Sequence, residues 1–365
     1  MTAAVAPAID RRDVPTAQEL RALSTPAGPR PSTAVGVAFA AADFALFYTG
    51  AAAVVFAPWW SVKVAGTAIC GIATAMLFAL AHDAAHGSLA ASRRMNRLLA
   101  SLCFLPSWYP YTPWVRGHNH LHHGWTNVAE CDYAWRPVSP ADYAAMPRWR
   151  RGLERAYRSW WGLWTHSIVE IWWKHMVMPR ESDRRYLSAR WLCIDRLFVA
   201  TSVAAHVALC WLVAPRWATL AGGPPMPPAL IAVMVLVAPW WIFHVMFSVV
   251  TFLHHTHESV PWFRTKRESS YFVGQVRSTV HMELPRWLER LLHNITVHSA
   301  HHVDPRIPFR HLPDAQARLM TAFTADVRME RWSLRSFIAV TRACQLYDYD
   351  ARQWRRFRSA AGGRW

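Results

Sequence analysis

Histidine is the residue type through which this sequence could do chemistry, and its histidines are clustered. The stretch His118–Asn127 (HNHLHHGWTN) places four of them within six residues. Imidazole nitrogen is the commonest protein ligand for iron, copper and zinc. Three clusters, here called box 1, box 2 and box 3, combine histidines at short spacings: His82 and His86; His118, His122 and His123; His298, His301 and His302.

Each box could present its imidazoles on one face of a helix. The two histidines of box 1 are four residues apart and would lie one above the other. In box 2, His118, His122 and His123 would share one side of an α-helix, whereas His120 would face away. Alternatively, the ligands of box 2 could be His120, His122 and His123, with the spacing His-x-His-His. The histidines of box 3 would form a tight three-ligand face.

Together the boxes supply eight histidines. A zinc site takes three or four protein ligands, so eight suit two ions close together. A shell made only of imidazoles, without thiolates, fits a redox metal better than Mg²⁺ or Ca²⁺, which prefer oxygen ligands. We therefore expect a di-iron centre that activates O2 above a hydrocarbon-filled cleft and attacks an unactivated C–H bond.

Four apolar runs must position the boxes. Each is close to the ~20 residues that a helix needs to cross a bilayer. We expect transmembrane helices at about 33–57, 62–86, 191–214 and 229–253. The sequence thus predicts an all-α integral membrane protein whose four transmembrane helices form two hairpins. Four such runs with arginine-rich flanks argue against buried helices of a soluble protein.

Basic residues predict the orientation. Of the 40 Lys and Arg residues, 37 lie before residue 34, between residues 86 and 190, or after residue 253. We therefore expect both termini and the histidine boxes on the cytoplasmic side, in a bacterial inner membrane. The net charge of +17 has the same cause, so no nucleic-acid partner is predicted. Basic patches there could attract anionic lipid or an acidic electron carrier.

The expected layout has three parts. Residues 1–31 form a polar leader without the apolar stretch of a cleaved signal peptide. Residues 32–315 form the membrane domain, whose cytoplasmic helical cap at 87–190 and 254–315 carries the boxes. Residues 316–365 form a basic cytoplasmic C-terminal segment. The six cysteines show no paired spacing, which argues against a disulfide framework or a four-thiolate zinc site.

Other polar residues are less clearly placed. Asp43 lies inside the first apolar run, where a carboxylate is costly, and is a candidate functional group. We expect an interfacial segment at 96–114, which three prolines interrupt, and an amphipathic interfacial helix at 153–178. His166 and His175 in that helix are expected to pack rather than to bind metal, because neither has a histidine neighbour at ligand spacing.

The boxes resemble those of the membrane fatty acid desaturase superfamily, over roughly residues 35–315. His-Asp-Ala-Ala-His-Gly-Ser at box 1, Trp114 followed by box 2 and Thr126-Asn127, and His-Asn-Ile-Thr leading into box 3 resemble the family's three boxes. The third is most similar to the omega-6 acyl desaturases. His255-Thr256-His257, followed by Val260-Pro261-Trp262, is also similar to that group. The superfamily usually supplies one further ligand there, with His257 as the first choice and His255 as the second.

This resemblance implies an O2-dependent fatty acyl desaturase with two Fe ions and O2 as co-substrate. The acyl group would be linked to a lipid, a carrier protein or coenzyme A. A separate ferredoxin- or cytochrome b5-type donor would supply electrons, because no cytochrome b5-like His-Pro-Gly-Gly sequence is fused to either end. Asp83, Asn127, Asn294 and Asp304 would orient the imidazoles. The implied metal ligands are His82, His86, His118, His122, His123, His257, His298, His301 and His302.

One departure leaves other reactions open. The omega-6 group spaces its second box His-x-x-His-His, whereas His118-x-x-x-His122-His123 also resembles alkane-hydroxylating relatives. A related di-iron hydroxylase, acetylenase, epoxygenase or carotenoid oxygenase is therefore an alternative. A metal transporter or sensor would instead need ligands at bilayer depth along a pathway. The boxes lie at the ends of the apolar runs and in loops, which favours an enzyme.

Overall fold

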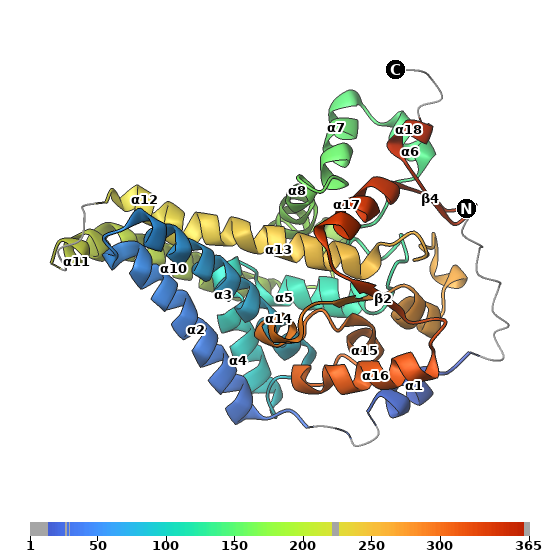
Figure 1. The fold of residues 1–365 in the computed structure, drawn as a ribbon, viewed down its shortest axis with the longest axis horizontal. Helices are drawn as coiled ribbons and strands as arrows, with labels where there is room; N and C mark the ends of the chain where they lie inside the picture. Colours follow the sequence, from blue (N-terminus) through green and yellow to red (C-terminus); the bar gives the residue numbers. More distant parts are fainter. Residues whose placement is uncertain (1–13, 26–27, 29, 221–225, 361–365) are drawn as a thin grey trace.

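Four long apolar helices carry the fold in the computed structural model, which describes residues 14–25, 28, 30–220 and 226–360 (Figure 1). Each is long and apolar enough to cross a membrane, in agreement with the four expected spans. The first two are α2 (Thr33–Phe56) and α3 (Trp60–His86). The third consists of α10 (Ala189–Ala208), η5 (Leu209–Val213) and α11 (Ala214–Leu220), and the fourth of α12 (Pro228–Ala232), η6 (Val233–Val237) and α13 (Ala238–His255).

Helix α3 is the central helix of the four. In its apolar window 67% of the residues are buried, against 11% in the third span, most of whose side chains face outward. Helices α2 and α13 pack along α3 (Figure 1). Gly50 and Gly66 allow the crossing of α2 and α3, because a Cβ on Gly66 would lie 2.6 Å from the Gly50 carbonyl oxygen.

The rest of the described chain gathers at one end of these helices, where α3 and α13 end in His86 and His255 (Figure 1). Helices α11 and α12 lie at the opposite end. The gathered helices are α1 (Ala17–Ser24), α4 (Arg93–Cys103), η2 (Leu105–Ser107), α5 (Tyr111–Trp114), η3 (Val115–His122), α6 (Pro140–Ala145), α7 (Arg148–Tyr157), α8 (Leu163–His166), η4 (Ser167–Val177), α9 (Glu181–Arg184), η7 (Lys266–Glu268), η8 (Val273–Arg277), α14 (Arg286–Leu291), α15 (His298–Val303), η9 (Phe309–His311), α16 (Leu312–Ala322), α17 (Leu334–Ala343) and α18 (Phe357–Ala360).

Two small sheets interrupt the otherwise helical fold, which the all-α expectation did not include. Strand β1 (Val280–Glu283) pairs in parallel with β2 (Arg328–Arg331), with Val280 opposite Arg328. Strand β3 (Leu346–Asp348) pairs antiparallel with β4 (Gln353–Arg355). The expected boundary at residue 315 falls inside α16, and β2 returns to β1. The described residues after 315 therefore pack against those before it.

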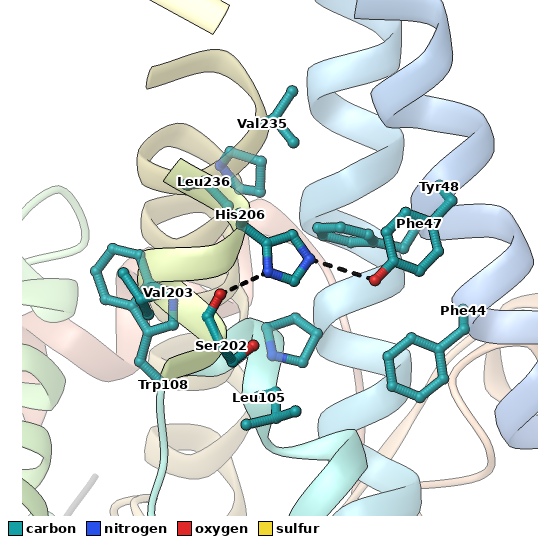
Figure 2. A pocket seen from close by; sticks show the side chains of 12 residues that line it. Phe44, Phe47, Tyr48, Leu105, Trp108, Ser202, Val203, His206, Val235 and Leu236 are labelled. Carbon is teal, nitrogen blue, oxygen red and sulfur yellow. Dashed lines mark hydrogen bonds between the residues drawn. The ribbon is translucent and has the colours of Figure 1, made fainter. Parts of the chain in front are cut away.

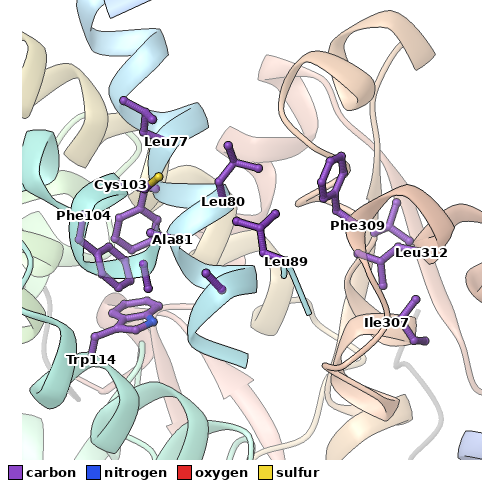
Figure 3. Packing of buried hydrophobic residues seen from close by; sticks show 14 of the residues in the cluster. Leu77, Leu80, Ala81, Leu89, Cys103, Phe104, Trp114, Ile307, Phe309 and Leu312 are labelled. Atoms are coloured by element: carbon purple, nitrogen blue, oxygen red, sulfur yellow. The ribbon is translucent and has the colours of Figure 1, made fainter. Parts of the chain in front are cut away.

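A buried apolar cluster connects the apolar helices to the gathered segments. Leu77 and Leu80 of α3 lie near Leu89, and Phe309 and Leu312 belong to the same cluster on the far side of Leu89 (Figure 3). Full burial of a leucine or phenylalanine side chain contributes roughly 1.5–3 kcal/mol. This cluster fixes the end of α3, with box 1, relative to the segment that carries box 3.

Of two expected interfacial elements, one is interrupted as expected and the other differs in the structure. The segment 96–114 is not one continuous helix but forms α4, η2 and α5, separated by short turns near its prolines. The expected continuous helix at 153–178 is broken between Tyr157 and Leu163. Arg158 lies in this break and is 2% exposed. Its guanidinium donates a 2.6 Å hydrogen bond to the Trp135 carbonyl, which offsets part of the cost of burying the charge.

Candidate metal centre

Nine histidines converge in two groups where α3 and α13 end. Within each group, one ring nitrogen of every member lies within 4.8 Å of the corresponding nitrogens of the others. The groups adjoin, since the rings of His123 and His302 stack with centroids 4.1 Å apart. Group one consists of His82, His86, His118, His123 and His301, and group two of His122, His255, His298 and His302.

Box 2 divides between the two groups, and its helix is not an α-helix. Helix η3 is a π-helix, and it ends in a hydrogen bond from the His123 N–H to the His118 carbonyl, at 2.9 Å. Bonds from residue i to i+5 place residues five apart on one face. His118 and His123 therefore meet in group one, with their Nε2 atoms 3.1 Å apart. His122 points into group two, which differs from the expected single face.

Box 3 also serves both groups. On α15, His298 and His302 are one turn apart and belong to group two, whereas His301 belongs to group one. The three do not form the expected single face. The Nε2 atoms of His301 and His123 are 3.2 Å apart. Box 1 behaves as expected, because both its histidines extend from the last turn of α3 into group one.

The additional histidine of group two is His255, the second choice from the sequence. Its Nε2 lies 2.7 Å from Nε2 of His298. His257, the first choice, lies outside both groups. Its Nδ1 contacts the Ser259 hydroxyl at 2.9 Å, and its Nε2 accepts a hydrogen bond from Arg328 at 3.1 Å. The physical reason is that α13 ends at His255, so the chain turns away before residue 257.

The Nδ1 atoms of several imidazoles are held by polar neighbours. The His122 Nδ1–H donates to the Asp132 carboxylate at 2.9 Å, and the His302 Nδ1–H donates to the Gln275 side-chain oxygen at 2.9 Å. The His255 Nδ1–H donates to the Ser278 carbonyl at 3.1 Å. In group one, Nδ1 of His82 lies 3.0 Å from the Asp83 carboxylate. These bonds fix the ring orientation and leave Nε2 directed into each group.

Of the four expected orienting residues, Asp83 alone contacts a box imidazole. The Asn127 and Asn294 side chains donate to backbone carbonyls, and Asp304 pairs with Arg306. The reasoning from sequence missed Asp132 and Gln275. Asp132 lies in the polar turn ten residues after His122. An acidic residue so soon after a histidine box could have indicated a partner for one of its imidazoles. Gln275 carried no local signal, because it comes from η8, far along the chain.

The ring nitrogens are suited to metal binding at neutral pH. Burial, followed by the neighbouring imidazoles, holds the pKa values of His123, His298, His301 and His302 well below 6.5. Neutral imidazole is the form that binds metal. The groups also contain buried nitrogens without any hydrogen-bond partner among the described residues, including Nε2 of His86 and His302.

The donor set fits two transition-metal ions. Nitrogens bound to one ion at about 2.1 Å lie about 3 Å apart, and the closest pairs in the two groups lie 2.7 to 3.2 Å apart. Orphaned buried nitrogens are costly unless a cation satisfies them. Imidazole ligands favour iron, copper or zinc over Mg²⁺ or Ca²⁺. Group one and group two would each hold one ion.

An aromatic layer separates the histidines from the middle of the apolar helices. The Trp114 ring stacks on His118 with centroids 4.5 Å apart, and Phe78 packs edge-on against Trp114 at 4.9 Å. A separate apolar hollow lies between α2, α10 and the fourth span, where Val235 and Leu236 of η6 line it (Figure 2). Its polar groups are paired: the Tyr48 hydroxyl donates to His206 Nε2 at 3.3 Å, and the His206 Nδ1–H donates to the Ser202 carbonyl.

A buried hydrogen bond fixes the approach to box 3. His293 and Asn294 both adopt a left-handed backbone conformation, with φ 53°, and make a sharp corner five residues before His298. The His293 Nε2–H donates to the Asp43 carboxylate at 2.7 Å. Asp43, whose carboxylate would be costly in lipid, therefore has a hydrogen-bond partner inside the protein.

The remaining histidines named from the sequence lie outside both groups. His166 stacks on Trp135 with centroids 4.1 Å apart, and His175 stacks on Tyr133 at 3.8 Å. His120 is exposed on the solvent side of η3. Gly117 is required for the close approach of Tyr133 beside box 2, because a Cβ there would lie 2.1 Å from the Tyr133 hydroxyl.

Comparison with known proteins agrees with this geometry. The sequence matches the model of the family "Fatty acid desaturase" over residues 57–335. It is 29% identical over 304 residues to the chloroplastic omega-6 fatty acid desaturase of Glycine max, covering 80% of this chain and 64% of that protein. It is 29% identical over 310 residues to the sn-1 oleoyl-lipid 12-desaturase of Anabaena variabilis, covering 80% and 79%. The corresponding protein of Arthrospira platensis is 30% identical over 267 residues, covering 71% and 68%. The chain thus spans less than two thirds of the length of the plant relative.

Proposed function

The chain belongs to the fatty acid desaturase family, and we propose that it is a membrane-bound, O2-dependent di-iron oxidoreductase that introduces a double bond into a fatty acyl chain. The observation that carries this proposal is the convergence of nine histidines into two adjoining groups where two apolar helices end. Such a site lies next to hydrocarbon and offers ligands only for transition metals.

The nine histidines of the two groups would hold the two irons. Iron bound there supplies the O2-activating chemistry that removal of hydrogen from an unactivated methylene requires. The chain's own residues keep the ligands neutral by burial and orient them through Asp83, Asp132 and Gln275. Trp114 and Phe78 cover His118 with aromatic surface, which excludes water from that side of the site.

The proposed reaction needs an external reductant. Formation of one double bond removes two hydrogen atoms from adjacent carbons. With two electrons and two protons supplied from outside, these hydrogens reduce one O2 to two water molecules. A ferredoxin- or cytochrome b5-type carrier would deliver the electrons one at a time.

A lipid-linked oleoyl chain is the first substrate to test. The relatives are named for omega-6 and for sn-1 oleoyl-lipid 12-desaturation. The hollow of Figure 2 is lined mostly by apolar side chains and is compatible with hydrocarbon. Acyl groups on coenzyme A or a carrier protein are the alternatives.

The arrangement in the membrane forms part of the proposal. We place the four helices as two transmembrane hairpins in a bacterial inner membrane, with residues 32–315 as the membrane domain. The histidines and the basic segments face the cytoplasm, because 37 of the 40 Lys and Arg residues would then lie on that side.

The test is lipid analysis of a host that lacks the expected product. The chain would be expressed together with ferredoxin and its reductase, and total fatty acids analysed by gas chromatography with mass spectrometry. His301→Ala removes a group-one nitrogen, and His311→Ala is the matched control because His311 lies outside both groups. We expect a new double bond in the fatty acids of hosts that express the native chain or His311→Ala, and none in hosts that express His301→Ala.

Other products would redirect the proposal. The spacing His118-x-x-x-His122-His123 is the observation that favours the second candidate, a di-iron hydroxylase, acetylenase or carotenoid oxygenase. A hydroxylated or triple-bonded chain would establish that candidate. An unchanged fatty acid profile with a working donor would contradict acyl desaturation and turn the search to carotenoids.

A further inference from the structure

One largely exposed surface adjoins the histidine groups and has no part in the chemistry proposed above. It consists of the exposed residues His120, Trp125 and Lys266 and the half-buried Arg116, and we call it the Trp125 surface. Arg116 and His120 are one turn apart on η3. The His120 carbonyl is adjacent to Gly124, where a Cβ would lie 2.3 Å from it, and Trp125 follows. The Lys266 ammonium lies 4.6 Å from the centre of the Trp125 ring.

The Trp125 surface is closely connected to both groups. His86 and His118 are the two partly exposed members of the nine, and His118 lies two residues from His120. Trp125, which is 38% exposed, is joined by one peptide bond to Thr126. The Thr126 hydroxyl lies 3.2 Å from His302 Nδ1 and donates to the His122 carbonyl at 2.9 Å. An exposed indole is thus linked to group two by one peptide bond and one polar contact.

Two cations of the Trp125 surface are held against aromatic rings. Lys266 lies over Trp125, and the Arg116 guanidinium lies 4.2 Å from the centre of the Tyr186 ring. Stacking holds these side chains in one orientation, so they lose less conformational entropy when a partner protein binds. Small redox partners form weak, limited interfaces that depend on complementary charge more than on apolar area. The exposed Trp125 and Lys266, together with the half-buried Arg116, meet that requirement.

We propose that the Trp125 surface is the docking site of an acidic one-electron carrier protein. The proposal rests on the proposed function, which consumes two electrons for each double bond. Two reduced carriers would dock in turn, each being oxidised by one electron that passes to the metal centre. The acidic face of the carrier would meet Arg116 and Lys266, and its redox group would lie against Trp125.

Anionic lipid is the competing partner for basic residues in this protein, and another surface suits it better. The guanidinium of Arg97, a residue of α4, lies 3.9 Å from the ring centre of Trp191, near the start of the third span. Such a pair of a basic and an aromatic residue is typical of the membrane interface. The residues of the Trp125 surface instead belong to η3, to the turn after it and to η7, and none of them is part of a span. A soluble carrier is therefore favoured there.

The test measures binding, without turnover. The native chain, in nanodiscs of zwitterionic phosphatidylcholine, would be titrated with an acidic plant-type [2Fe–2S] ferredoxin and with the soluble domain of cytochrome b5. Lys266→Glu is expected to weaken the affinity at least tenfold at low salt, and Lys266→Arg to preserve it. Arg318→Glu makes the same charge change on the exposed face of α16 and is expected to change the affinity less than twofold. Binding should weaken with ionic strength.

Three results would overturn the docking proposal: no saturable binding of either carrier to the native chain, equal losses in Lys266→Glu and Arg318→Glu, or a Lys266→Glu effect on capture of phosphatidylserine vesicles but not on the carriers. Monodisperse elution and an unchanged unfolding temperature would establish that each variant is folded. Failure of desaturation would appear in the fatty acid profile and leave this binding measurement unaffected, so the two failures are distinguishable.

Discussion

The Asp43 carboxylate lies 2.7 Å from Nε2 of His293, although 250 positions separate the two residues. The side chains are 4% and 3% exposed, respectively. One belongs to the first apolar helix and the other to the left-handed corner before box 3. The pair therefore connects the membrane-spanning part of the fold to the segment that delivers His298, His301 and His302.

Removing this carboxylate should destabilise the protein and the site together. Asp43→Ala leaves a buried imidazole without its partner, which costs about 1–3 kcal/mol. We expect a lower unfolding temperature in detergent and a lower iron content per chain. Asp43→Asn should recover part of both, because its side-chain oxygen can still accept from His293. Thr49→Ala, on the exposed side of the same helix, should change stability by no more than about 0.5 kcal/mol. Equal effects of Asp43→Ala and Thr49→Ala would contradict a positioning role.

The alternative assignments His255 and His257 predict different metal contents. His255→Ala removes a group-two nitrogen, so iron measured by inductively coupled plasma mass spectrometry should fall from two ions per chain towards one. His257→Ala should retain both ions, because that ring contacts Ser259 and Arg328 instead. If His257→Ala lost an ion while His255→Ala kept both, the choice between them would be reversed.

Asp132 should tune the affinity of group two. Its carboxylate accepts from His122 Nδ1–H and from the Asn127 and Ala134 N–H groups. Asp132→Asn replaces a charged acceptor with an amide, and loss of such a partner typically weakens metal binding 10–100-fold. Competition with a chelator would measure this change. Asp350→Asn removes an exposed carboxylate paired with Arg264 and should leave the chelator titration unchanged.

Protonation of Glu170 should lower the stability of the folded protein at acid pH. Burial raises its pKa, but hydrogen bonds from Lys174 and Arg150 lower it more, to about 2. The stabilisation is therefore complete above 4.5, the ordinary pKa of a glutamate, and is lost as pH falls from 4.5 through about 2. After discounting for partial solvation, roughly 2 kcal/mol is expected. Unfolding measured between pH 5 and pH 3 should show a smaller loss in Glu170→Gln than in the native chain. Parallel curves would contradict the assignment.

The sequence by itself determined the apolar helices and the chemical character of the site. Hydrophobic runs of membrane-spanning length are a local property, and the four helices of the structure match them. The clustering of imidazoles is equally local, and all eight histidines of the three boxes lie in the two groups. The family resemblance rested on the same short motifs and is confirmed by the comparisons.

The tertiary structure alone decided how these histidines are divided and supported. The π-helix of box 2 brings His123 to the side of His118, and His122 belongs to the other group; α-helical spacing does not predict this pairing. The end of α13 selects His255 over His257. Gln275 reaches His302, and Asp43 reaches His293, across long stretches of chain. Such contacts depend on which helices pack together, and local spacing carries no information about them.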